Sequence, residues 1–178
     1  MKLGCGRFNT YLVWALLLVG AAGCTSTGGH HKHKEASTLR LYLEADPDAG
    51  GSTATVPVIR ANPVAVTIQT NPFLDETDLA DAEVVDVMGG FAIQVTFDFH
   101  GRLILQNTTG ANHGRRIVVF SVFGSVTGGR WLAAPMITKA ISNGVLTFTP
   151  DATREEAQRV VDGLNNLAEK LGNRPKAK

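Results

Sequence analysis

The sequence has few cysteines and no marked excess of positive or negative charge. Its 178 residues include only two cysteines, Cys5 and Cys24, and both lie near the N-terminus. Two cysteines in these positions do not form the disulfide framework of a small secreted scaffold. Seventeen lysines and arginines against 16 acidic residues leave a formal net charge of +1. The composition therefore gives no electrostatic argument for binding nucleic acid.

Motifs of the common enzyme classes are also absent. There is no Gly-x-Ser-x-Gly elbow, no P-loop, no His-Glu-x-x-His and no Cys-x-x-Cys. Asp98 and His100 could form an acid–base pair, but an aspartate that caps a helix beside an exposed histidine is the favoured interpretation. The sequence predicts a protein that is not an enzyme, with no catalytic residue, no cofactor and no small-molecule substrate.

Long hydrophobic runs are lacking after residue 23. The apolar run from Tyr11 to Gly20 follows Lys2 and Arg7, and at ten residues it is shorter than the ~20 that a transmembrane helix needs. This pattern is typical of an export signal. An ordinary cleaved signal peptide or an uncleaved anchor would also fit the run.

The residues after that run, Ala21-Ala22-Gly23-Cys24, resemble the lipobox of bacterial lipoproteins. The resemblance implies cleavage after Gly23, acylation of Cys24 and attachment to a lipid bilayer, with the rest of the chain facing the periplasm. Acyl chains on one residue anchor firmly, because each buried methylene contributes ~0.8 kcal/mol. Thr25, in place of an aspartate that would resemble an inner-membrane retention signal, favours the outer membrane.

Residues 24–38 read as a flexible tether, rich in serine, threonine and glycine. Three histidines within it, His30, His31 and His33, could capture a transition metal. A solvated spacer whose lysines lie near anionic head groups explains the same run, and we favour it because no further ligand has suitable spacing.

The remainder predicts a single α+β domain over residues 39–172, followed by a structureless tail at 173–178. Hydrophobic residues make up 44% of the chain, enough to bury a core. Period-two runs predict a mainly antiparallel sheet with two helices packed on one face. Residues 39–44 alternate as a half-buried strand does, and a later strand places Phe91, Ile93, Val95 and Phe97 on one face. The hairpins are expected around Met88-Gly89-Gly90, at 123–129 and at Asn143-Gly144.

Two segments have helical patterns. The first spans 98–112, and its spacing turns Leu103 and Ile104, with Asn107 and Ala111, toward the core. The second begins after Thr153, which pairs with Glu156 as a capping box and is followed by one apolar face as far as Leu171. Gly172 suits the left-handed end of this helix.

Several short motifs in fixed order resemble SecD, a subunit of the protein translocase. They are Gly101-Arg102-Leu103, the run from Asn112 to Phe120, Trp131 to Ile137, Ile141 to Gly144, and Thr153 to Ala157. Over residues 84–171 they are similar to the head subdomain of SecD's first periplasmic domain. The resemblance implies a related head-like fold and a role in protein transport. SecD spans the membrane several times and this chain has no such run after Gly23, so it is not expected to act as a translocase motor by itself.

The remaining candidate site is a surface. Phe123 and Trp131 flank a glycine-rich hairpin with Val126 at its tip, and exposed apolar residues there could bind an exported polypeptide or an envelope protein. Alternatively both rings fold back onto the sheet, which we favour for Trp131. Two other hypotheses remain, namely self-association through a sheet edge as a structural envelope component, and metal capture by the tether.

Overall fold

A computed structural model describes residues 35–48, 51–124 and 128–174. Lys34–Lys178 forms one compact unit. Its elements are β1 (Thr38–Leu43), β2 (Thr53–Val58), β3 (Val64–Gln69), β4 (Leu74–Asp75), the 3-10 helix η1 (Glu76–Asp78), β5 (Leu79–Val87), β6 (Gly90–Phe97), α2 (Phe99–Ala111), β7 (Ile117–Val122), β8 (Arg130–Ala133), β9 (Val145–Phe148) and α3 (Arg154–Leu171).

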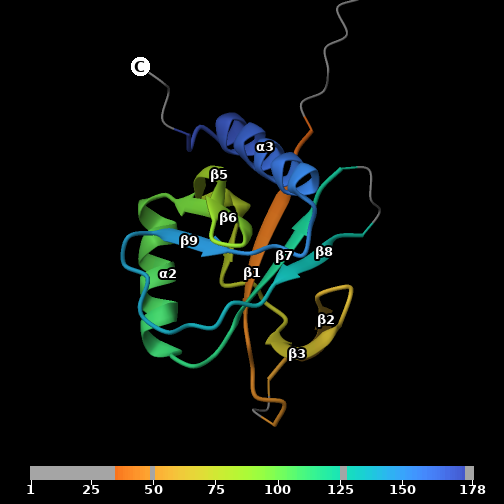
Figure 1. The fold of residues 1–178 in the computed structure, drawn as a ribbon. Coiled ribbons are helices and arrows are strands. Elements are labelled where there is room, and N and C mark those ends of the chain that lie inside the picture. The colour runs from red at the N-terminus through yellow and green to blue at the C-terminus, as the bar shows by residue number, and fades with distance from the viewer. Residues whose placement is uncertain (1–34, 49–50, 125–127, 175–178) are drawn as a thin grey trace, which may run out of the picture. The chain divides into compact units, whose positions relative to one another are not determined.

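All strand pairings in the described ranges are antiparallel, and they form three sheets (Figure 1). The largest has the order β4-β1-β7-β8, the second is β5-β6-β9, and β2 pairs with β3 alone. The prediction of a mainly antiparallel α+β domain with two helices is confirmed. The sequence did not indicate the division into three sheets, because the pairing of strands is a long-range property.

The main core lies between the four-stranded sheet, the three-stranded sheet and the two helices. The long helix α3 packs against β5, β6 and β1, and α2 contacts β4 and β6. Fully buried side chains such as Leu41, Ile93, Val95 and Leu164 fill the space between them. The apolar alternation Phe91, Ile93, Val95 and Phe97 faces this core, as its spacing predicts.

A second, smaller core covers the other face of the four-stranded sheet. Tyr42 and Val118 point away from the main core and meet the β2–β3 pair through Val58 and Ile68. Strand β1 is therefore buried on both faces, whereas its alternating sequence predicts a strand with one solvated face. Among its outward side chains only Arg40 is exposed.

The helix ends follow from local chemistry. Thr153 and Glu156 form the predicted capping box of α3, and Gly172 ends the helix at φ 79°. Asp98 caps α2 by accepting a hydrogen bond from the Gly101 amide at 2.8 Å.

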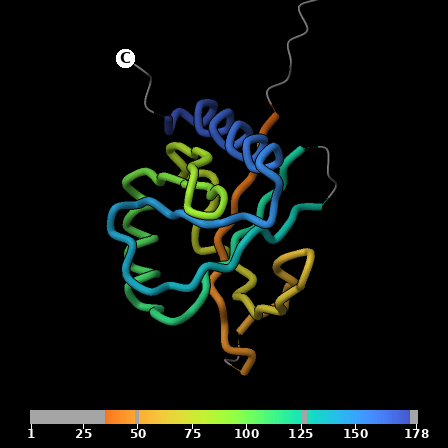
Figure 2. The backbone as a smooth tube through the Cα atoms, viewed as in Figure 1, coloured from red at the N-terminus to blue at the C-terminus, as the bar shows by residue number. Residues whose placement is uncertain are grey.

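The predicted core face of α2 is wrong except at Ile104, which packs against the main core. Leu103 is exposed, and so are Asn107 and Ala111, while Ile104 is only partly buried. Gly101, Leu105 and Thr109, four residues apart, are the buried positions of this helix. The segment of residues 134–144 runs beside α2 (Figure 2), and its Ile141 amide donates to the Thr109 hydroxyl at 2.9 Å. That contact buries a polar residue on the inner face, which a hydrophobic pattern does not reveal.

The ordered domain extends past both predicted boundaries. Ser37 is buried beside Gly163 of α3, so the last residues of the predicted tether belong to the fold. At the other end, Asn173 donates to the Thr77 carbonyl and Arg174 pairs with Asp81 at 2.9 Å. Cys24, the tether histidines and the tail from residue 175 lie outside the described residues.

Candidate binding groove

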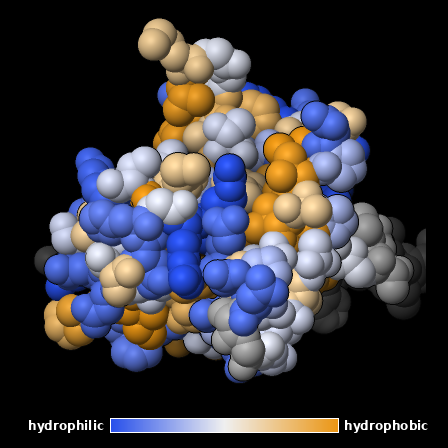
Figure 3. All heavy atoms as spheres, turned by 90° about the horizontal axis from the view of Figure 1, so that it is seen from below, coloured by the Kyte–Doolittle hydropathy of each residue, from blue (hydrophilic) through white to orange (hydrophobic). Residues whose placement is uncertain are grey.

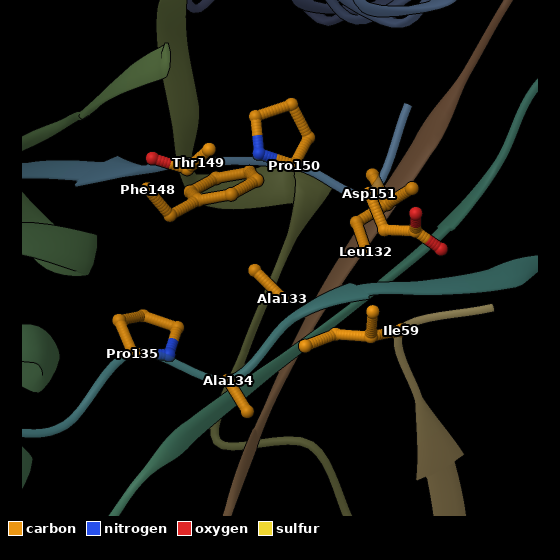
Figure 4. Close-up of a pocket in the computed structure, with 9 residues that line it drawn as sticks. All are labelled: Ile59, Leu132, Ala133, Ala134, Pro135, Phe148, Thr149, Pro150 and Asp151. Carbon is orange, nitrogen blue, oxygen red and sulfur yellow. The ribbon is translucent and has the colours of Figure 1, made fainter. Parts of the chain in front are cut away.

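An apolar groove opens between three segments that are distant in the sequence (Figure 4). Its volume is about 470 Å³, within the range of ~300–1,000 Å³ that is usual for ligand pockets. The lining comes from the end of β2, from β8 with the residues after it, and from the link between β9 and α3. The lining residues are Ile59, Leu132, Ala133, Ala134, Pro135, Phe148, Thr149, Pro150 and Asp151.

Two extended segments form opposite walls of this groove. Strand β8 is an edge strand of the four-stranded sheet, and residues 148–151 leave the edge strand β9. One backbone hydrogen bond joins the walls, from the Asp151 amide to the Leu132 carbonyl at 2.7 Å. Because Phe148 and Pro150 are themselves buried, the walls are held in place without any ligand.

Ile59 closes one side of the groove in an unusual conformation. Its φ is 70°, and a β-branched residue in the left-handed region is strained by about 1–2 kcal/mol. Its side chain is 43% exposed at the groove edge. Strain of this kind persists only where the surroundings impose it, and it often accompanies a functional site.

An ionic network next to Ile59 imposes that conformation. Asp151 Oδ2 accepts from the Arg60 amide at 2.8 Å and from Arg60 Nε at 3.2 Å. Arg60 also lies 3.7 Å from Glu156 Oε2, and Arg130 Nη1 donates to Glu156 Oε1 at 3.1 Å. The hydrogen bond from Arg130, followed by that from the Thr153 amide, lowers the pKa of Glu156. The carboxylates of Asp151 and Glu156 are therefore engaged within the fold, and the remaining lining offers apolar contact.

The structure changes the interpretation of the predicted surface residues. The expectation that Phe123 is exposed is wrong, because this ring is 5% exposed, belongs to the main core and lies 4.8 Å beneath the Arg130 guanidinium. Trp131 folds back onto the sheet, as favoured, and packs against Tyr42 and Phe120. Val126 lies outside the described residues.

Asp98 and His100 do not form an acid–base pair. Asp98 caps the helix, while Nδ1 of the exposed His100 lies 2.7 Å from Asp78 Oδ1. The hydrogen bond to Asp78, and then its negative charge, raise the pKa of His100. In the described ranges there is no cluster of three or more potential metal ligands. Within the same ranges, no helix is both long and apolar enough to cross a bilayer.

Sequence reasoning missed the groove. Its lining comes from residues 59, 132–135 and 148–151, and no local pattern joins them. One weak signal was present, because the apolar runs that form the two walls end in Pro135 and Pro150. Proline interrupts strand pairing and leaves an extended backbone beside it.

Comparison with known proteins gives a match at the level of structure alone. No family model matches the chain, and no curated protein matches it significantly. One similar solved structure is SecDF in a super-membrane-facing form, with a TM-score of 0.52 and 21% identity over 74% of this chain. Another is SecDF described as a membrane component that enhances protein export, with a TM-score of 0.51 and 20% identity over 93% of this chain.

The chain has a SecDF-like fold. The predicted SecD head-like domain is thus confirmed as a fold, and at 93% coverage the likeness extends beyond residues 84–171. The chain spans 19% of the length of the first SecDF chain and 71% of the second. In this SecDF-like domain the groove joins the end of β2, which precedes the segment of sequence resemblance, to β8 and to the link between β9 and α3, which lie within it.

Proposed function

We propose that this SecDF-like domain is a non-enzymatic, periplasm-facing binding module that holds an extended apolar segment of an exported polypeptide in its groove. The observation that carries the proposal is the preformed apolar groove between the two strand-edge walls, with the strained Ile59 at its rim. Support comes from the fold, since one SecDF of similar structure is described as a component that enhances protein export.

The chemistry of the lining fits a polypeptide of variable sequence. Asp151 is the charged residue of the lining, and its carboxylate is engaged by Arg60. Recognition would therefore depend on apolar contact, which tolerates many sequences. Burying two large apolar side chains would contribute about 3–6 kcal/mol before the cost of ordering the chain. Such a gain produces a weak and rapidly reversible contact, as transport of a moving chain requires.

The anchor is a second part of the proposal. Acylation of Cys24 would hold the domain at a membrane by a tether that ends at Ser37, where the fold begins. A lipid-anchored module meets exported chains close to the bilayer without spanning it. Labelling of the chain with a radioactive fatty acid, lost in a Cys24→Ala variant, tests this part separately.

Site-specific photo-crosslinking in cells tests the groove. A photoreactive amino acid at Ala134, inside the groove, should give crosslinks to exported polypeptides. The matched control is the same amino acid at Met88, which is fully exposed on the β5–β6 turn and does not line the groove.

Crosslinks at Ala134 that decrease when export is blocked would support the proposal. Equal crosslinking from Ala134 and Met88, or no crosslinks to exported chains from Ala134, would contradict it. An Ala134→Trp variant adds a second test, because a ring that fills the groove should abolish the contact while the domain still melts cooperatively.

A further inference from the structure

Acidic and basic residues are separated into two neighbouring segments of the sequence. Residues 61–98 contain acids only, and residues 99–150 contain bases only. The acids are Asp75, Glu76, Asp78, Asp81, Glu83, Asp86 and Asp98. The bases are Arg102, Arg115, Arg116, Arg130 and Lys139. The second segment begins with α2 and ends at the groove, so the basic residues lie on different elements from most of the acids.

Three acids of the acidic segment are paired with a basic side chain. Asp86 pairs with Arg154, Asp81 with Arg174, and Asp78 with His100. In the basic segment, Arg130 pairs with Glu156, and Arg116 donates to the Ala134 carbonyl. Three cations, Arg102, Arg115 and Lys139, contact no carboxylate in the ranges that the structure describes. On and beside α2 these three cations outnumber the one carboxylate of Asp98, which caps the helix.

Exposed apolar side chains accompany these three cations. Phe99 is 68% exposed and Leu103 41% exposed, one helical turn apart on the outer face of α2. The Arg102 guanidinium lies 5.1 Å from the centre of the Phe99 ring. Met136, which is 53% exposed, lies in the segment that follows β8. Apolar residues lie between strongly polar ones on the face seen from below (Figure 3).

The cations lie near the two ends of α2. Arg102 is close to its N-terminus. At the other end of the helix, Ala140 approaches Gly110, and the Gly114 amide donates to the Ile137 carbonyl at 2.9 Å. These contacts bring Lys139 and Arg115 to the C-terminal end of α2. We name Phe99, Arg102, Leu103, Arg115, Met136 and Lys139 the α2 surface.

We propose that the α2 surface docks onto an anionic lipid bilayer, with Phe99 and Leu103 inserted at the level of the head groups. Arginine and lysine beside exposed apolar rings are the chemistry of interfacial helices, since the cations meet lipid phosphates while the apolar tips leave water. Two carboxylates at the start of α2 are engaged within the fold, because Asp98 caps the helix and Asp78 is paired with His100.

Shape favours a bilayer over a protein partner. Phe99 and Leu103 project from the convex face of a helix, and the groove lies on other elements. A protein would need a complementary concave surface to bury them, whereas a fluid head-group region accommodates single projecting side chains. The proposal does not depend on the function of the groove.

Fluorescence quenching by lipids with brominated acyl chains tests the docking in the full chain bound to vesicles. A Phe99→Trp variant reports on the α2 surface, and a Met88→Trp variant reports on an exposed site in the acidic segment. Native Trp14 and Trp131 are present in both variants and cancel in the comparison. Quenching should be greater at position 99 than at position 88 when the vesicles contain phosphatidylglycerol, and it should decrease in pure phosphatidylcholine.

A charge variant completes the test. Combining Arg102→Gln, Arg115→Gln and Lys139→Gln with Phe99→Trp should weaken the docking equilibrium by on the order of 100-fold, because each cation near an anionic surface contributes roughly fivefold.

Equal quenching at positions 99 and 88 would overturn the proposal. So would quenching at 99 that is unchanged in phosphatidylcholine or in the charge variant. Binding of polyglutamate to the α2 surface without quenching would assign the surface to an acidic protein instead. Circular dichroism confirms that each variant is folded.

Discussion

The side-chain amide of Asn165 pairs with both backbone groups of Ala82, 83 residues away. Asn165 Oδ1 accepts from the Ala82 amide at 2.9 Å, and Asn165 Nδ2 donates to the Ala82 carbonyl at 2.8 Å. Strand β5 is an edge strand, and this side chain of α3 takes the place that a neighbouring strand would occupy. An edge occupied in this way is protected against pairing with another chain.

Removing that amide should expose the edge. An Asn165→Ala variant leaves two backbone groups of the buried Ala82 without partners, and we expect the free energy of unfolding to fall by about 1–3 kcal/mol. Asn166→Ala is the control, because this neighbour donates to the exposed Glu35 carbonyl. Urea unfolding measures both variants. Equal losses at 165 and 166 would contradict the assigned role, and sedimentation shows whether only Asn165→Ala promotes self-association.

Replacing two helical glycines by alanine should change the stability of the domain in opposite directions. A Cβ on Gly163 would lie 2.6 Å from the Ser37 backbone nitrogen, so Gly163→Ala should destabilise the domain by about 1–3 kcal/mol. Gly110 in α2 has only the Ala140 methyl nearby, at 3.8 Å, so Gly110→Ala should stabilise it by about 0.5–1 kcal/mol. Thermal melts of the two variants give the comparison. A stabilising effect of Gly163→Ala would show that Ser37 does not pack under α3.

The His100–Asp78 pair makes stability depend on pH. Because the pKa of His100 in the folded state lies above its usual value of 6.5, the pair stabilises the fold in full below pH 6.5. The contribution is lost as the pH rises through the folded-state pKa. An Asp78→Asn variant should therefore differ from the unsubstituted chain most at acidic pH. NMR titration of the His100 ring should show a lower pKa in this variant; an unchanged pKa would rule out Asp78 as its cause.

At position 59 a glycine variant should be more stable than an alanine variant, which is the reverse of the usual order of stability. Both Ile59→Ala and Ile59→Gly remove the exposed sec-butyl group, but only glycine relieves the strain at φ 70°. We expect the glycine variant to be more stable than the alanine variant by about 1 kcal/mol. The control is the same pair of substitutions at Val64, an exposed strand position, where alanine should be the more stable. An alanine variant at 59 as stable as the glycine variant would mean that no strain is stored there.

Local chemistry made much of the fold predictable. The capping box at Thr153, the left-handed Gly172 and the alternation from Phe91 to Phe97 each depend on neighbours within a few residues, and each is confirmed. The core face of α2 was predicted incorrectly, because Thr109 is buried by a contact with Ile141, 32 residues away. Strand order likewise depends on partners that a single segment does not reveal.

The candidate site was harder to predict, for the same reason. Phe123 beside a glycine-rich loop has the local signature of an exposed ring, but the Arg130 guanidinium covers it across the hairpin. Ile59 has an ordinary sequence context, and its strain comes from the distant carboxylate of Asp151. A groove assembled from three separate segments appears only when the chain is folded.

The position of Ser37 beneath α3 has a mechanical consequence. Beyond Ser37 the chain enters β1, whose six residues are paired with β7 from Thr38↔Val122 to Leu43↔Ile117. A pull on the N-terminal segment would load these hydrogen bonds together in shear, and α3 would resist at the point of entry. The strand that receives the force is thus in the middle of its sheet, so a domain held by its N-terminus can bear tension without losing its groove.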